Sequence, residues 1–209
     1  MSTLKRFLSL LVLIIPASAM AQVNIVNFDF GAVPVQCSSW GFTYQGAQLT
    51  CIYPVTQNFN QTPGFGWTLG WPVSLNGSPR FGGVGVTGPG GAFCPPSFEG
   101  LPFQQAAILQ SLGAFAWQNI PGFTAGSYTL SFYLGGRCSY GPQRLVAMID
   151  GNVIGTWDVA VGMPFILETA SFTVTASGSH VLEFMGMNAG DTTAFVSYVT
   201  ITPTARHGR

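Results

Sequence analysis

Apolar and polar residues alternate strictly in the second half of the chain. In residues 127–134 every second position is apolar, so Tyr128, Leu130, Phe132 and Leu134 share one face. This alternation is typical of a half-buried strand. Comparable segments, each ended by Gly, Asn, Asp or Ser, are 144–149, 153–159, 170–175, 180–187 and 193–201. Strands at spacings of about ten residues predict an all-β fold, a single antiparallel β-sandwich of about eight to ten strands.

The apolar positions of these segments also predict the core. The residues expected to be buried between the two sheets are Tyr128, Leu130, Phe132, Leu145, Ile149, Phe172, Val174, Leu182, Phe184 and Phe195. Glu168 and Glu183 lie in the same alternating segments and are interpreted as polar residues that face outward.

Two turn sequences join predicted strands. Asp150-Gly151, or the same turn shifted to Gly151-Asn152, separates two apolar strands, and these residue types tolerate positive φ. Asp150 is therefore interpreted as a turn residue rather than a catalytic acid. Ser177-Gly178-Ser179 joins the next two strands, and His180 is interpreted as a polar residue at a strand entrance.

The first half of the chain has no such regularity. Between Gly31 and Phe103 the only charged residues are Arg80 and Glu99, while glycine, proline and aromatic residues crowd together. Because glycine and proline favour turns, we expect a long aromatic-rich loop region here.

Composition narrows the class of protein. The 209 residues are 47% hydrophobic and 7% charged, with seven basic and seven acidic residues. A disordered chain contains fewer apolar residues, and a nucleic-acid-binding protein needs a basic surface. The 27 glycines and 14 prolines disfavour a helix bundle. We therefore expect a globular domain without a nucleic-acid partner.

The N-terminus has the three regions of a secretory signal peptide. Lys5 and Arg6 precede an apolar run at 7–15, and small residues follow at 17–21. We expect cleavage after Ala21, so that the mature protein is secreted, either into the periplasm or outside the cell.

The remaining chain is expected to hold one β-sandwich domain over 22–203, followed by a flexible tail over 204–209. Crossing a bilayer requires about 20 consecutive apolar residues. The sequence after residue 21 contains no such stretch, so no membrane span is expected.

Export changes the interpretation of the four cysteines, Cys37, Cys51, Cys94 and Cys138, because thiols are oxidised outside the cytosol. Two disulfides are expected, and three pairings are possible. We prefer Cys37 with Cys51, which closes a short loop, and Cys94 with Cys138, which ties a Gly- and Pro-rich segment to the end of a strand. The alternative is a zinc site, but the chain has no Cys-x-x-Cys spacing, and no metal ligands are assigned.

Five runs in the second half carry a resemblance to a known family. They are 126–132, 136–137, 149–151, 178–184 and 190–196. In this order they resemble the galactose-binding-like jelly rolls, which occur in carbohydrate-binding modules and in short secreted bacterial proteins of the PEP-CTERM-sorted kind. The resemblance implies a jelly-roll sandwich.

The resemblance extends upstream and implies three further features. Residues 26–30 look like the opening strand of the family, 66–68 like a turn that contains a structural Trp67, and 105–109 like another strand.

Two departures from the family pattern concern metal binding and the C-terminus. Many members hold a structural calcium ion with acidic residues at two positions, which here are Gly31 and Ser197-Tyr198. Because calcium prefers several oxygen ligands with carboxylates among them, we expect no cofactor, and nearby Asp29 and Asp191 keep calcium open as an alternative. The chain also ends without the hydrophobic sorting tail, which implies release.

Exposed aromatic planes beside neutral hydrogen-bonding groups suit the apolar ring faces and hydroxyls of sugars. The residues that offer such contacts, and are the candidate ligand-binding residues, are Trp40, Tyr44, Trp71, Arg80, Arg137 and Tyr140. The alternative is that the aromatic residues form a satellite core under the loops.

Arg137 and Tyr140 depend on the cysteine pairing. If Cys94 pairs with Cys138, the loop that contains Glu99 would lie beside Arg137 and Tyr140 at one edge of the sandwich. Arg137 would then either contact a sugar or brace the loop by pairing with a carbonyl or a carboxylate.

The function that these features favour is non-catalytic binding of a polysaccharide or glycan. Glycoside hydrolysis needs two carboxylates at a set separation. The sequence shows no such pair, no nucleophile elbow and no Cys-His pair, so no catalytic residues are assigned. The alternative is a matrix or adhesin-like protein with a protein partner, because sparse charge and exposed strand edges favour association. A glycan-active enzyme is a third interpretation.

The cysteine assignment gives a direct test. Alkylation of the exported, unreduced protein should add no label to any of Cys37, Cys51, Cys94 and Cys138, as measured by intact mass. Labelling of all four thiols would contradict both the disulfides and the predicted compartment.

Overall fold

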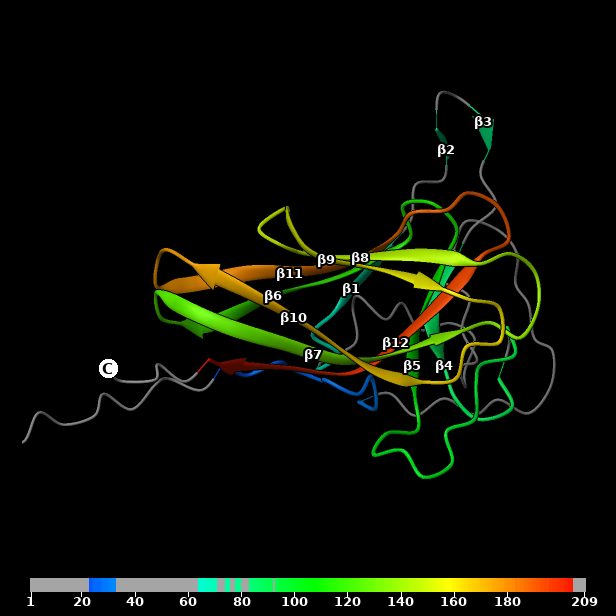
Figure 1. Cartoon of the computed structure of the whole chain (residues 1–209), viewed down its shortest axis with the longest axis horizontal. Coiled ribbons are helices and arrows are strands. Elements are labelled where there is room, and N and C mark those ends of the chain that lie inside the picture. Colours follow the sequence, from blue (N-terminus) through cyan, green and yellow to red (C-terminus); the bar gives the residue numbers. More distant parts are fainter. Residues whose placement is uncertain are drawn as a thin grey trace, which may run out of the picture.

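The described part of the chain is a sandwich of two five-stranded antiparallel sheets (Figure 1). The structure is a computed structural model that describes residues 23–32, 64–70, 74–75, 78–79, 83–91 and 93–204. The first sheet has the order β1 (Thr68–Gly70), β6 (Phe115–Phe123), β11 (Gly178–Gly186), β8 (Gln143–Ile149) and β9 (Asn152–Val159). The second sheet has the order β10 (Ile166–Val174), β7 (Gly126–Gly136), β12 (Thr193–Pro203), β5 (Ala106–Gln110) and β4 (Gly83–Thr87). Two short strands, β2 (Ser74–Leu75) and β3 (Ser78–Pro79), form a separate pair.

Strands that are distant in sequence are neighbours in both sheets. β11 lies between β6 and β8, and β12 lies between β5 and β7. From β5 onward the chain changes sheets at every connection except the one between β8 and β9. This is the topology of a jelly roll, and the prediction of an all-β antiparallel sandwich is confirmed. None of the described elements is a helix, so none could cross a membrane as one.

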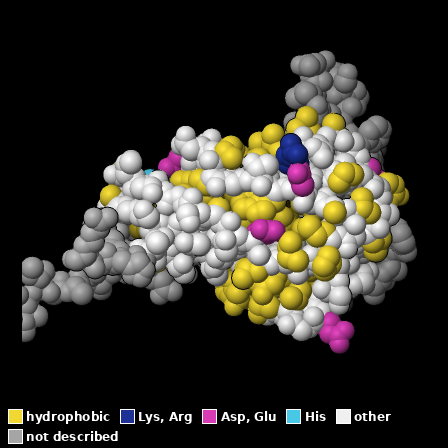
Figure 2. Space-filling view, viewed as in Figure 1, with side chains coloured by type: hydrophobic (Ala, Val, Ile, Leu, Met, Phe, Trp, Pro, Cys, Tyr) yellow, Lys and Arg dark blue, Asp and Glu magenta, His cyan; other side chains and the backbone are white. Residues whose placement is uncertain are grey.

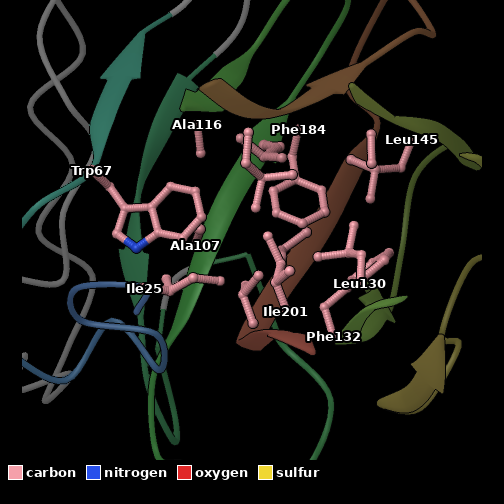
Figure 3. Packing of buried hydrophobic residues seen from close by; sticks show 14 of the residues in the cluster. Ile25, Trp67, Ala107, Ala116, Leu130, Phe132, Leu145, Phe184 and Ile201 are labelled. Carbon is pink, nitrogen blue, oxygen red and sulfur yellow. The ribbon is translucent and has the colours of Figure 1, made fainter. Parts of the chain in front are cut away.

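Apolar residues on the facing sides of the sheets form the main core (Figure 3). All ten residues predicted as core are at most 8% exposed, and each such Leu, Val or Phe contributes about 1.5–3 kcal/mol when it is removed from water. Trp67 closes one end of this core, where its ring stacks on Phe30 with centroids 5.0 Å apart and its Nε1–H donates to the carbonyl oxygen of Asn27. Trp67 is therefore structural, as the resemblance implied.

A second core cluster lies on the outer side of the second sheet. It consists of Phe93, Phe98, Phe103, Ala106, Ile108, Phe165 and Phe195. Phe195 therefore faces away from the other predicted core residues, while Phe93, Phe98 and Phe103 come from the aromatic-rich region before β5. For these three aromatic residues, the interpretation as a satellite core under the loops is the correct one.

The segment expected to be the opening strand is a turn instead. Residues 26–30 form a turn in which Asn27 and Phe30 have φ of 52° and 58°. The backbone N–H and carbonyl of Val26 bond to the side-chain amide of Gln118, and the carbonyl of Phe28 accepts from the N–H of Val199. Side-chain partners thus replace the regular ladder of a strand, which an Asn-x-x-Phe pattern does not reveal.

The prediction that Glu168 faces outward is also wrong. Glu168 is paired with Phe132, whose side chain is in the main core, so Glu168 lies on the inner side of β10. β10 is an edge strand of the second sheet, and this position lets a carboxylate on the inner side remain partly exposed. Polar residues that point inward at an edge strand are a known way to discourage edge-to-edge pairing.

The hairpin between β8 and β9 has the predicted turn, and its first residue makes further bonds. Asp150 and Gly151 have φ of 49° and 76°, as a two-residue hairpin turn requires. The carboxylate of Asp150 accepts from the backbone N–H of Val181 at 2.8 Å and contacts Nδ1 of His180 at 2.5 Å. The turn is thereby tied to the start of β11.

His180 is held between two hydrogen-bond acceptors. Its Nδ1 faces Asp150 and its Nε2 lies 3.0 Å from the carbonyl oxygen of Ala176, while its ring packs edge-on against Phe123. Only the imidazolium can donate both bonds. The hydrogen bond to Asp150 raises the pKa of His180 against the opposing effect of burial. Burial opposes ionisation of Asp150, but the bonds from His180 and Val181 outweigh it and lower the pKa of Asp150.

These shifts predict how stability depends on pH. The contribution of His180 is fully present below its unfolded pKa and is lost as the pH rises through the raised folded value. The contribution of Asp150 is present above its unfolded pKa and is lost as the pH falls through the lowered folded value. In thermal unfolding, the contribution of the His180–Asp150 pair to stability should therefore be largest between about pH 4 and pH 6.5.

Substitution of His180 by Gln should remove this dependence. Relative to the wild type, the free energy of unfolding of the variant should be lower by about 1 kcal/mol at about pH 5.5 and by much less at about pH 9. An equal loss of stability at both pH values would show that the imidazolium is not the species that holds the turn.

Candidate binding site

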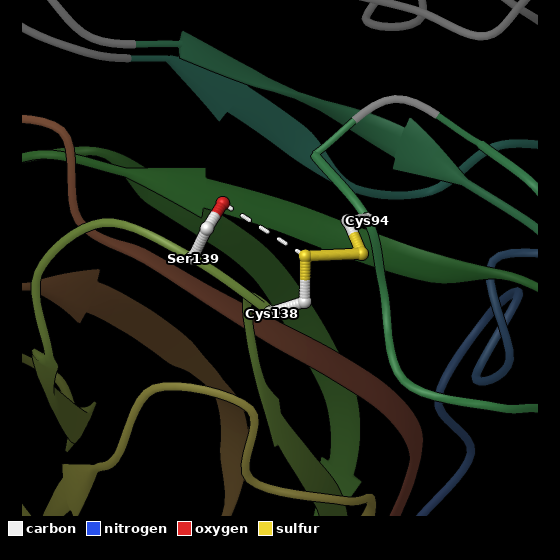
Figure 4. The surroundings of a disulfide bond; sticks show 3 residues. All are labelled: Cys94, Cys138 and Ser139. Carbon is white, nitrogen blue, oxygen red and sulfur yellow. Dashed lines mark hydrogen bonds between the residues drawn. A yellow bond between two sulfur atoms is a disulfide. The ribbon is translucent and has the colours of Figure 1, made fainter.

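The loop before β5 is covalently joined to the end of β7. A disulfide connects Cys94 and Cys138, whose Cα atoms are 5.6 Å apart, and the sulfur of Cys138 lies near the hydroxyl of Ser139 (Figure 4). The N–H of Cys138 also donates to the carbonyl oxygen of Cys94. This is the pairing preferred from the sequence, whereas Cys37 and Cys51 lie outside the described residues. The two cysteines that the disulfide joins are 44 residues apart in the sequence.

The side chain of Arg137 lies beside this disulfide, directly after β7. Its guanidinium carbon is 4.7 Å from the ring centroid of Phe93 and 4.0 Å from that of Tyr140. Its Nη1 donates to Oδ1 of Asp191 at 2.5 Å, and only 11% of the side chain is exposed. A planar cation between two rings and paired with a carboxylate is strongly held in place, so Arg137 acts as a brace.

Asp191 joins three elements at this position. Its Oδ1 accepts from Arg137 and from the side-chain amide of Gln110, at the end of β5. Its backbone carbonyl accepts from the N–H of Gly141, and Gly141 forms a parallel bridge with Thr192. The loop after β7 and the loop before β12 are therefore tied together. We call Gln110, Arg137, Tyr140 and Asp191 the rim cluster.

Tyr140 is the most exposed aromatic residue among those that the structure describes, with 62% of its surface accessible. Its backbone has φ of 74°, and its ring lies over the guanidinium of Arg137. One side of the ring contacts Arg137 and the other is open to solvent. A flat apolar surface is thus held next to the carboxylate of Asp191, of which 42% is exposed.

The structure brings together two of the six predicted ligand-binding residues, Arg137 and Tyr140. The other four, Trp40, Tyr44, Trp71 and Arg80, lie outside the described residues. Glu99, expected beside Arg137, is exposed, and its N–H bonds to the hydroxyl of Ser97. The carboxylate that pairs with Arg137 comes instead from Asp191, 54 residues away in sequence.

Sequence reasoning missed the roles of Asp191 and Gln110. Both lie at strand ends, Gln110 at the end of β5 and Asp191 just before β12. The pairing of β5 with β12 brings these ends together. Period-two alternation predicts each strand but not which strands are neighbours, so no local signal connects these residues.

Hydrogen bonds within the fold engage the polar groups in the region where the family resemblance suggested calcium. The hydroxyl of Ser197 bonds to the carbonyl oxygens of Gln105 and Asp29, and the side-chain amide of Gln105 donates to the carbonyl of Phe30. The carboxylate of Asp29 accepts from the N–H of Gly31. These oxygens therefore already accept hydrogen bonds within the fold. No group of three His, Cys, Asp or Glu residues lies close together in the described part of the chain.

Comparisons with known proteins give similarity in structure alone. No family model matches the sequence, and no curated protein matches it. A cyclase from Fischerella sp. TAU has a TM-score of 0.49 with 16% identity over 88% of this chain and 98% of its own. The N-terminal xylanase modules of Clostridium thermocellum solved with xylohexaose have a TM-score of 0.47 with 16% identity, over 69% of this chain and 27% of their own. A xylan-binding domain from Paenibacillus barcinonensis has a TM-score of 0.46 with 12% identity, over 69% of this chain and 90% of its own.

The bracing role of Arg137 can be tested by stability. Arg137→Ala should lower the free energy of unfolding by about 2 kcal/mol, because it opens a gap between two rings and leaves Asp191 without its cation.

Arg144 provides the matched control. It pairs with Asp158, but the two side chains are 53% and 76% exposed, so Arg144→Ala should leave the free energy of unfolding nearly unchanged. Equal effects of the two substitutions in urea unfolding would exclude the brace.

Proposed function

We propose that the chain is a secreted, non-catalytic module that binds a polysaccharide or glycan at the rim cluster. The observation that supports this most is the exposed ring of Tyr140, which the guanidinium of Arg137 holds in one orientation. A ring that is ordered before binding loses little side-chain entropy when a ligand arrives. The Cys94–Cys138 disulfide and the Asp191 pair supply that order.

The rim cluster offers the two kinds of contact that a sugar needs. The open side of the Tyr140 ring can pack against the C–H face of a pyranose. The exposed carboxylate of Asp191 can accept hydrogen bonds from hydroxyls, and hydrogen bonds to charged groups are stronger than those between neutral groups. The positive charge of Arg137 is already paired with Asp191, so the cluster favours a neutral ligand over an acidic one.

Three of the described aspartates are engaged by partners within the fold. The hydrogen bond from Arg144 lowers the pKa of Asp158. The pKa of Asp150 is also lowered, because its bonds to His180 and Val181 outweigh the effect of burial. A general acid needs the opposite shift. Asp191 is engaged by Arg137 and Gln110. These three aspartates therefore act as structural partners, and the proposal includes neither a catalytic residue nor a cofactor.

Assembly with a protein partner is the second candidate, supported by one feature of the surface. The edge strands β9 and β10 expose Val153, Ile166 and Leu167, at 60%, 40% and 57%. Figure 2 shows few charged side chains on the visible side and hydrophobic side chains gathered over its right-hand part. Exposed apolar residues on edge strands can pair with another chain. Concentration-dependent elution in size-exclusion chromatography, together with no signal on a glycan array, would favour this candidate.

Tyr140→Ala should separate binding from stability. The variant should bind insoluble neutral polysaccharide about tenfold more weakly, because a ring contact of about 1–1.5 kcal/mol is lost. Its melting temperature should stay close to that of the wild type, since Tyr140 is exposed. Val153→Ala, an exposed apolar residue at the β9 edge, is the control and should change neither quantity.

The same comparison extends to Trp40, Trp71 and Arg80. Alanine variants of these residues should be ranked by both binding and melting temperature. If each variant that loses binding also loses stability, including Tyr140→Ala, the proposed site is wrong and these residues are structural.

A further inference from the structure

The disulfide beside the rim cluster lies at the surface of the molecule. Cys94 and Cys138 are both exposed, and neither belongs to the main core or to the second core cluster (Figure 4). The bond is therefore open to attack by a thiolate from solution, which is the first requirement of thiol–disulfide exchange. Disulfides that only hold a fold together resist reduction, whereas exposed and strained disulfides are the labile and regulatory ones.

The backbone at one end of this disulfide is strained. Phe93 and Cys94 have φ of 67° and 47°, so two consecutive residues with a β-carbon adopt the left-handed conformation. This conformation is uncommon for residues other than glycine, and a bulky residue such as Phe keeps it only where the surrounding structure imposes it. The crosslink and the hydrogen bond from the N–H of Cys138 to the carbonyl of Cys94 both act on this strained pair. Opening of the bond would let the pair relax, which favours reduction.

Reduction would release only a short stretch of the loop. Pro96 lies against β7, because a β-carbon at Gly135 would be only 2.9 Å from its Cγ atom. Phe98 and Phe103 lie in the second core cluster, with ring centroids 5.9 Å apart. None of these contacts involves a cysteine. The loop is therefore anchored from Pro96 onward without the crosslink, and reduction should move residues 93–95 while the sandwich stays folded.

The other end of the disulfide is held by the backbone of the sandwich. The N–H of Gly136 donates to the carbonyl of Met163 at 2.9 Å, and the carbonyl of Arg137 accepts from the N–H of Gly162 at 2.6 Å. Cys138 directly follows these residues. The backbone of Arg137 should therefore keep its position when the bond opens.

The ring of Phe93 connects the disulfide to the rim cluster. Phe93 directly precedes Cys94, is 5% exposed, and its ring centroid lies 4.7 Å from the guanidinium carbon of Arg137. The same guanidinium lies 4.0 Å from the ring centroid of Tyr140. When residues 93–95 move, the guanidinium loses one of its two aromatic contacts. It then gains freedom of movement and no longer holds Tyr140 in one orientation.

We propose that the Cys94–Cys138 disulfide is a thiol-exchange site, and that its reduction by an external dithiol loosens the rim cluster. Oxidised, the chain holds the rim in the geometry described above. Reduced, it keeps its sandwich but loses the order of Arg137 and Tyr140. Control of sugar binding by this step rests on the proposed function, whereas the exchange and the loosening do not.

The exchange balances with one dithiol. A thiolate of the dithiol attacks one sulfur of the disulfide, forms a mixed disulfide and displaces the other cysteine as a thiolate. The second thiolate of the dithiol attacks the mixed disulfide and displaces the remaining cysteine. The dithiol loses two electrons and becomes a cyclic disulfide, and its two protons pass through the solvent to the two cysteine thiolates.

The exchange is tested on the native protein. Dithiothreitol is added to the folded chain without denaturant, free thiols are alkylated, and the labelled peptides are mapped by mass spectrometry. We expect label on both Cys94 and Cys138, and recovery of the disulfide when oxidised dithiothreitol replaces the reduced form. The reduced protein should still melt in one cooperative transition, because neither core cluster contains a cysteine.

The loosening is measured by NMR of the 15N-labelled protein, without any sugar. The Nε atom of Arg137 is buried, which protects its proton from exchange with water, and its signal is assigned by its loss in Arg137→Lys. This signal and the amide signals of 137–142 should shift on reduction. Phe93→Ala should produce a similar shift of the Arg137 signal with the disulfide intact.

The double variant Cys94→Ser with Cys138→Ser is the matched control for other cysteines. Its rim signals should match those of the reduced wild type and should not respond to dithiothreitol. The reduced wild type and the double variant should both bind neutral polysaccharide about threefold to tenfold more weakly than the oxidised wild type, because the ring of Tyr140 must be ordered on binding.

Three results would overturn the inference. These are protection of Cys94 and Cys138 from label until denaturant is added, loss of the cooperative melting transition on reduction, and rim signals that stay in place after reduction. Equal sugar binding by the oxidised and reduced forms would contradict the control of binding alone. Absence of sugar binding by the oxidised protein would contradict the proposed function, while the labelling and the rim signals would still decide the exchange.

Discussion

The packing of two sheets against one another is the constraint on which the other features depend. With 7% charged residues, the chain has few ion pairs to hold its shape, and the main core between the sheets contributes most of the apolar burial. Large rings such as Trp67, Phe132 and Phe184 interlock there, with Phe132 and Phe184 centroids 4.9 Å apart. Because such cores are close-packed, the strand ends and outer faces have a set geometry, and loops of irregular sequence can be positioned on them.

The rim cluster shows how that geometry is used. β7 ends at Gly136, and the next residues supply the guanidinium brace and the disulfide. Asp191 arrives from the loop before β12, and Gln110 from the end of β5. Three strands of one sheet therefore converge on the carboxylate of Asp191. The guanidinium that this carboxylate holds in turn orients the ring of Tyr140.

The sequence predicted much of the fold, and the failures have physical causes. The alternation in 127–134 and in the later segments predicted β7–β12, most clearly for β7 and β10, which bury one side. The prediction of a strand at 26–30 was wrong. There the side chain of Gln118 and the backbone N–H of Val199 in β12 bond to the segment in place of strand partners. The alternation failed for Glu168, because an edge strand tolerates an inward carboxylate. The partner of Arg137 depends on which strands are neighbours, and a one-dimensional pattern does not contain that information.

The central claim is that a neutral sugar binds at the rim cluster, which the sandwich and the disulfide hold in one geometry, and amide shift mapping tests it most directly. Titration of the 15N-labelled protein with a neutral oligosaccharide should shift amide signals in 137–142 and 187–192 at the rim cluster. Signals of the buried inner strand positions should stay in place. Shifts confined to the exposed edges β9 and β10, or none at saturating oligosaccharide, would contradict the account.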